Sequence, residues 1–146
     1  MHDALLILHS YFRWLVLLAG LVAVAKMFAG WTKSLAWTEA DRRAAVLFTV
    51  AIDVQLLLGL ALFAVSPLVR NAMRDIATAM ATPDVRIFVA DHPATMLIAL
   101  ALAHAGSAAA KRAATDAARF RQGAILYGLS LALILWGIPW FRLFTK

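Results

Sequence analysis

The sequence predicts an all-α integral membrane protein: a four-helix bundle with a short interfacial helix between the second and third spans. Hydrophobic residues make up 64% of the 146 residues, and the mean hydropathy is +0.82. Soluble domains are about half apolar, so a water-soluble core of this size could not bury so many apolar side chains. The apolar residues also fall in blocks of about 20, the length of a helix that spans a bilayer. We therefore expect a single transmembrane domain over residues 1–146.

Four apolar blocks and one amphipathic stretch organise the chain. The predicted membrane spans are residues 4–27, 44–65, 86–110 and 122–144. Backbone amides in hydrocarbon need internal partners, and no block alternates as barrel strands do, so we expect each block to be helical. Residues 68–81 are too short and too charged to span, and their apolar and charged residues fall on opposite faces. They predict the interfacial helix, which serves either as a connector or as a lid over a site at that membrane face.

Two motifs indicate where helices begin. Thr38 followed by Asp41 is typical of an N-cap at the start of the second helix. The sequence Asp91-His92-Pro93 indicates that the third helix begins at Asp91, or that it has a kink there. In either case His92 stays near the end of its span.

The charge of the chain predicts its orientation in the membrane. The net charge is +6, but the basic residues lie in the short connections between apolar blocks, so we expect no nucleic-acid partner. The first and third connections hold Lys26, Lys33, Arg42, Arg43, Lys111, Arg112, Arg119 and Arg121, against six basic residues on the other side. Because cytoplasmic loops carry the excess of Lys and Arg, both termini are expected outside.

Two features of the sequence limit the chemistry and the processing of the chain. It contains no cysteine, which excludes disulfides, thiolate metal sites, iron–sulfur clusters and covalent c-type haem attachment. The N-terminus lacks a basic region and a small-residue cleavage site, so we expect the first block to be retained as a helix.

Two histidines within the predicted spans carry the functional hypothesis. Ionisable side chains inside a bilayer cost free energy, so those that occur there usually have a structural or functional role. His9 and His92 lie about five and six residues inside the outer ends of the first and third spans, or roughly 8–9 Å below that interface. Two imidazoles at one level on opposite walls of a bundle are what a six-coordinate haem iron requires. The alternative is that each histidine only hydrogen-bonds a neighbouring group.

The surroundings of the two histidines fit this hypothesis. Arg13 lies one turn from His9 and could pair with a haem propionate or a quinone oxygen. Arg70, Arg74 and Arg86 add positive charge at the same membrane face, and Met96 continues the face of His92. The faces of the two histidines continue along Val16, Gly20, Ala23, Ala99, Ala103 and Gly106. These small residues leave room for a flat macrocycle, or serve ordinary helix packing.

A second polar pair is predicted nearer the inner face. His104 lies about 18 Å from His92 along the third span, too far to share an iron with it. Asp53 of the second span lies at a similar distance from the inner face, so a hydrogen-bonded Asp53–His104 pair is expected. The pair would serve either as a link between helices or in proton exchange with the inner face.

Four short motifs resemble those of a known family. They are Leu8-His9-Ser10-Tyr11-Phe12-Arg13-Trp14, Gln55-Leu56-Leu57-Leu58-Gly59, Asp91-His92-Pro93 with Met96, and Ile138-Pro139-Trp140. Together they resemble, over nearly the whole chain, short bacterial four-helix proteins labelled cytochrome b. The resemblance implies one haem b held by His9 and His92. Together with the charge bias, it leads us to expect a multi-pass protein of the bacterial inner membrane with periplasmic termini. The histidines that a second haem would need are missing.

Three function classes follow from these observations. The first is a b-type cytochrome that moves one electron at a time, with a quinol or a redox protein as partner. A quinone-linked oxidoreductase belongs to this class. The second is a non-catalytic membrane subunit of a larger respiratory or photosynthetic complex. The third, a proton-coupled transporter using Asp53, His104 and Arg13, ranks last because the sequence has no internal repeat and no pair of broken helices.

Overall fold

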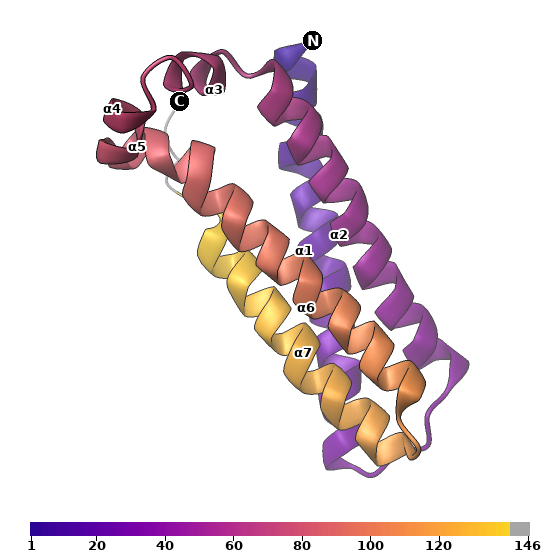
Figure 1. The fold of residues 1–146 in the computed structure, drawn as a ribbon. Helices are drawn as coiled ribbons and strands as arrows, with labels where there is room; N and C mark the ends of the chain where they lie inside the picture. The colour runs from indigo at the N-terminus through magenta and orange to yellow at the C-terminus, as the bar shows by residue number, and fades with distance from the viewer. Residues whose placement is uncertain (141–146) are drawn as a thin grey trace.

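Four long helices dominate the computed structural model, which describes residues 1–140 (Figure 1). The elements in chain order are α1 (His2–Thr32), α2 (Glu39–Val65), α3 (Pro67–Ala72), α4 (Ile76–Ala81), α5 (Pro83–Arg86), the π-helical turn η1 (Ile87–Asp91), α6 (His92–Arg112) and α7 (Asp116–Gly137). Elements α5, η1 and α6 are continuous, so the third long helix covers Pro83–Arg112. Each of the four long helices is long and apolar enough to cross a membrane, as the sequence predicted.

The packing places α1 and α6 at diagonal positions of the bundle. Helix α1 packs against α2 and α7, and α6 packs against the same two helices. Figure 1 shows α3, α4 and α5 gathered at the end of the bundle that holds the N-terminus. We call this end the histidine end (residues 2–13, 66–92 and 137–140). The opposite end, with the two remaining connections, is the basic end (residues 26–43 and 110–122).

Small residues let the helices approach closely. The six residues predicted to continue the two histidine faces are all buried. A Cβ atom at Gly20 would lie 2.9 Å from the Phe48 ring, and one at Gly106 would lie 2.8 Å from the Tyr127 ring. These two rings pack edge to face, with centroids 5.8 Å apart. The expectation that small residues leave room for a macrocycle is therefore wrong at Gly20 and Gly106, where aromatic rings fill the space.

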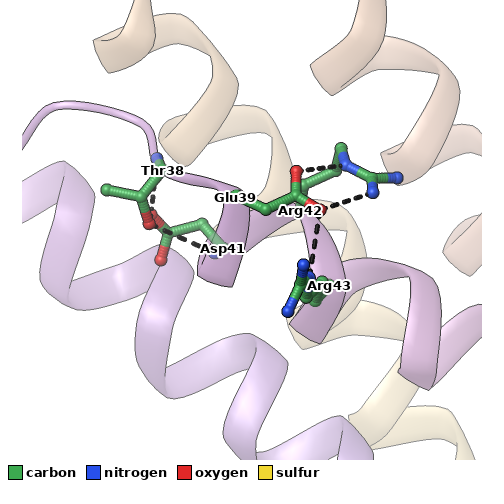
Figure 2. Close-up of polar contacts among 5 residues, drawn as sticks. All are labelled: Thr38, Glu39, Asp41, Arg42 and Arg43. Atoms are coloured by element: carbon green, nitrogen blue, oxygen red, sulfur yellow. Dashed lines mark hydrogen bonds and ion pairs between the residues drawn. The ribbon is translucent and has the colours of Figure 1, made fainter.

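The first two helices extend beyond the predicted spans. Helix α1 continues to Thr32 because no proline or turn interrupts it before Ser34, which has a φ of 49°. Helix α2 begins directly after Thr38, whose side chain accepts the N–H of Asp41. The Asp41 carboxylate in turn accepts the backbone N–H of Thr38 at 2.9 Å. Figure 2 shows Thr38 and Asp41 in this arrangement, and the predicted cap is confirmed.

Two short helices replace the single interfacial helix predicted for residues 68–81. Helix α3 ends at Ala72, and Asp75 has non-helical dihedral angles and caps α4 by accepting the N–H of Thr78 at 3.1 Å. Hydrogen bonds from the side chain and the backbone of Thr78 hold the pKa of the Asp75 carboxyl below its ordinary value. An aspartate that bonds locally in this way competes with helix continuation, which explains the break.

The third long helix passes through Asp91 instead of beginning there. Asp91 has helical dihedral angles and no capping bond, and its carboxylate accepts Nε of Arg86 at 3.1 Å. The N-cap prediction is therefore wrong. The N–H of His92 bonds to the carbonyl of Ile87, five residues back, which makes η1 a π-helical turn just before Pro93. An extra residue in one turn changes the direction of neighbouring side chains by about 100°, so η1 sets where His92 points.

Helix α7 lies earlier in the chain than the predicted span 122–144. It begins after the cap residue Thr115, whose side chain accepts a backbone N–H, and it ends at Gly137. Pro139 explains this end, because proline has no N–H and forces the residue before it into an extended conformation. Residues 141–144 of the predicted span lie outside the described part of the chain.

Candidate site at the histidine end

The structure brings His9 and His92 together. Their ring centroids lie 6.2 Å apart, and the ring planes meet at 81°. The two side chains come from the diagonal helices α1 and α6, and both are partly buried. The two imidazoles therefore lie next to each other inside the bundle, with their planes nearly perpendicular.

The distance between the rings can be compared with the distance that a shared metal ion requires. A bond from a metal to an imidazole nitrogen is about 2 Å, and the nitrogen lies about 1.1 Å from the ring centroid, so two imidazoles on opposite sides of one ion have centroids roughly 6 Å apart. The observed 6.2 Å fits this arrangement.

The backbone of α7 fixes the orientation of His92. Its Nδ1 lies 2.8 Å from the carbonyl oxygen of Gly137. Because a carbonyl only accepts, Nδ1 carries the hydrogen, and Nε2 of the neutral ring keeps its lone pair. Metal-binding histidines commonly donate their other N–H in this way. Gly137 was not among the site residues predicted from the sequence. Pro139 could have indicated it, because this proline ends α7 and the last carbonyls of a helix have no donor within the helix.

His9 is held by α2 and keeps one ring nitrogen without a partner. The Gln55 amide donates to the His9 carbonyl at 3.0 Å, and its Nε2 lies 3.3 Å from Nε2 of His9. Nδ1 of His9 and Oε1 of Gln55 are buried and have no hydrogen-bond partner within residues 1–140. Buried polar atoms are nearly always paired, so atoms without partners are compatible with a further ligand.

Two glycines allow close packing around the histidine pair. A Cβ atom at Gly59 would lie 3.1 Å from Cε1 of His9 and 3.5 Å from its Nδ1. A Cβ atom at Gly137 would lie 2.6 Å from the methyl group of Met96. Met96, which the sequence predicted as a cofactor contact, is thus packed beside the residue that binds His92.

Of the four arginines predicted to contact a cofactor, Arg13 lies near the two histidines, whereas the other three make no bond to them in the described part of the chain. Nε of Arg13 is buried without a partner among the described residues, and its guanidinium lies 5.7 Å from the ring centroid of Trp14. Arg13 is also close enough to both imidazoles to interact with them electrostatically. Within residues 1–140, no hydrogen bond or ion pair links Arg70, Arg74 or Arg86 to the two histidines. Arg13 is therefore the predicted arginine that the structure places at the pair.

Asp53 and His104 also meet, as a link between α2 and α6. Nε2 of His104 lies 2.7 Å from Oδ1 of Asp53. The two side chains remain 42% and 49% exposed, so the pair lies on the outer surface of the bundle. It forms a second polar site, separate from the two imidazoles at the histidine end.

No protein-family model, curated protein or solved structure matches this chain. The resemblance to cytochrome b proteins therefore stays an expectation from the sequence.

Within residues 1–140, no cluster of three or more metal-ligating side chains could hold an ion. Two axial ligands suffice for haem, because the porphyrin supplies the other four nitrogens. Two histidines can therefore be a complete set of protein ligands for a haem.

Proposed function

We propose that this chain is a membrane-embedded b-type cytochrome that transfers one electron at a time through a haem held by His9 and His92. The observation that carries the proposal is the pair itself, with ring centroids 6.2 Å apart on diagonal helices. The Gly137 bond to His92 and the unpartnered Nδ1 of His9 support it. When bound, the haem iron supplies one-electron redox chemistry.

The proposal includes insertion into the bacterial inner membrane as a multi-pass protein with periplasmic termini. Four helices have the length and hydropathy for it. Large apolar side chains also point outward from the bundle; Leu18 is 59% exposed, Leu57 65% and Trp136 86%. The basic end holds eight basic and three acidic residues, which favours the cytoplasmic side for that end. The histidine end would then lie near the periplasmic face.

The residues around the histidines have defined tasks in this proposal. The carbonyl of Gly137 orients the His92 ring and keeps the lone pair on Nε2. Gln55 fixes the position of His9 through its bond to the backbone of α1. Arg13 offers an unpaired donor for a propionate carboxylate or a quinone oxygen. The electron donor is accordingly a quinol in the bilayer or a redox protein at the same face.

An absorbance spectrum of the purified protein tests the proposal. We expect a Soret band and, after reduction, an α band. His9→Ala and His92→Ala should each lose most of the haem, while His104→Ala should retain it. Circular dichroism and size-exclusion chromatography would verify that the variants are folded. Unchanged haem content in either His9→Ala or His92→Ala would contradict the ligand assignment, and so would a wild-type protein that binds no haem.

One observation favours a second candidate function, a non-catalytic subunit of a larger respiratory or photosynthetic complex. The Asp53–His104 pair lies near the middle of α2 and is almost half exposed. An ionisable pair that faces lipid is costly, and a neighbouring subunit packed over α2 and α6 would bury it. Haem-free protein that migrates in a large assembly from native membranes would support this candidate. A haem-containing particle of a single 15.9 kDa chain would exclude it.

A further inference from the structure

A cavity of about 210 Å³ lies between α2, α6 and α7 at the basic end. The polar and aromatic part of its lining consists of Trp37, Arg42, Ser107, Lys111, Arg119 and Tyr127. Three of these side chains are cationic, and no acidic side chain among the described residues lines the cavity. Its position at the C-terminal end of α6 and the N-terminal end of α7 corresponds to a membrane interface if these helices span a bilayer.

The positive charge in this cavity is only partly neutralised. Lys111 makes no ion pair within residues 1–140. Arg119 reaches Asp116 only at 3.4 Å, and its Nε is buried without a partner. The other oxygen of Asp116 accepts the backbone N–H of Trp37 at 2.9 Å. The cavity is therefore lined by Lys111, which has no ion-pair partner in this part of the chain, and by Arg119, whose ion pair is long. The hydroxyl groups of Ser107 and Tyr127, which lie 3.1 Å apart, complete the polar lining.

Arg42 connects the cavity to an apolar surface on α2. It lines both this cavity and a second hollow of about 420 Å³ formed with Arg43, Val46, Leu47 and Val50. Figure 2 shows Glu39 bonded to both Arg42 and Arg43, which fixes the two guanidinium groups relative to each other. The three apolar residues continue along the exposed side of α2 towards the middle of the span.

We propose that the basic end binds one anionic phospholipid at this place. Its phosphate would contact Lys111 and Arg119, and an acyl chain would lie along Val46, Leu47 and Val50. Cationic pockets between transmembrane helices suit the head groups of anionic lipids. A free phosphate ion would use the charges but would leave the apolar hollow unfilled. The inference rests on membrane insertion, which is part of the proposed function, but it does not depend on haem.

Native mass spectrometry of the purified full-length protein tests this site. The protein is incubated with phosphatidylglycerol or with phosphatidylcholine of the same acyl chains, and bound lipid is counted per chain. We expect one phosphatidylglycerol to be retained in preference to phosphatidylcholine. Lys111→Gln and Arg119→Gln should each weaken its retention about fivefold, the contribution typical of one basic residue near an anionic lipid. Lys111→Arg should retain the lipid.

Arg121→Gln is the matched control, because Arg121 is an exposed residue of the same helix as Arg119 and does not line the cavity. Equal retention of both lipids would overturn the proposal, and so would equal losses in Lys111→Gln and Arg121→Gln. Displacement of phosphatidylglycerol by millimolar inorganic phosphate would overturn the assignment to a lipid. Because bound lipid is measured by mass, protein without haem gives the same readout. Extraction of the protein from membranes by alkaline carbonate would separately disprove insertion.

Discussion

At Gly59, adding a single methyl group is expected to displace the His9 ring. The Cβ atom of Gly59→Ala would lie 3.1 Å from Cε1 of His9, so the ring must shift by a few tenths of an ångström. We expect a lower haem content per chain, measured by the reduced-minus-oxidised spectrum. Alanine also raises helix propensity by about 1 kcal/mol relative to glycine, so a loss of helix cannot account for the effect.

Gly128→Ala is the control for this substitution, because a Cβ atom at Gly128 would meet nothing within 4 Å. It makes the same chemical change within a long helix and should leave the haem content unchanged. Equal haem content in Gly59→Ala and wild-type protein would show that the position of the His9 ring is not critical.

The sequence predicts a site residue well when its side chain has a recognisable chemistry and its depth along the helix can be counted. His9 with His92, and Asp53 with His104, could be paired because the rise of a helix is constant and counting residues gives depth. Gly137 could not be found in this way, since it contributes a backbone carbonyl and the side chain carries no signal. Arg70, Arg74 and Arg86 share the charge of Arg13, but charge alone does not determine which side chain reaches the interior of the bundle.

Among the helices, α2 has the most completely capped start. Removing the Thr38 hydroxyl from this capping box should lower the free energy of unfolding by about 1 kcal/mol. Unfolding of Thr38→Ala in mixed detergent micelles, followed by circular dichroism, would measure the change. Thr32→Ala is the control, because its hydroxyl bonds only to carbonyls of its own helix. If Thr32→Ala lowers the free energy of unfolding as much as Thr38→Ala does, the capping box contributes no more to stability than an ordinary hydroxyl bond within a helix.

The elements differ in how well the sequence predicts them. The four long helices follow from the apolar blocks, and the start of α2 follows from Thr38 and Asp41. The sequence offered a helix start or a kink at Asp91 but could not decide between them, because Pro93 suits the first turn of a new helix as well as a continuing helix with an altered turn such as η1. The break between α3 and α4 coincides with a local bond of Asp75, and a sequence pattern does not show whether such a bond wins over helix continuation.

For the whole molecule, the absence of cysteine in the sequence makes the proposed topology easy to test. Single cysteines at Asn71 and Leu35 would lie at exposed positions on opposite ends of the bundle. In intact cells, a membrane-impermeant maleimide should label Asn71→Cys, and it should label Leu35→Cys only after the cells are made permeable. The reverse pattern would contradict periplasmic termini, and labelling of both sites in intact cells would contradict a spanning bundle.

The diagonal arrangement of α1 and α6 has a consequence for how the protein is made. His9 leaves the ribosome early, whereas His92 belongs to the third long helix, so the two rings can meet only after that helix has been synthesised. Helix α7, which carries Gly137, is synthesised later still. A haem clamped between the two rings would therefore be loaded at the end of biogenesis. Nascent chains that stop after α2 would offer it a single imidazole.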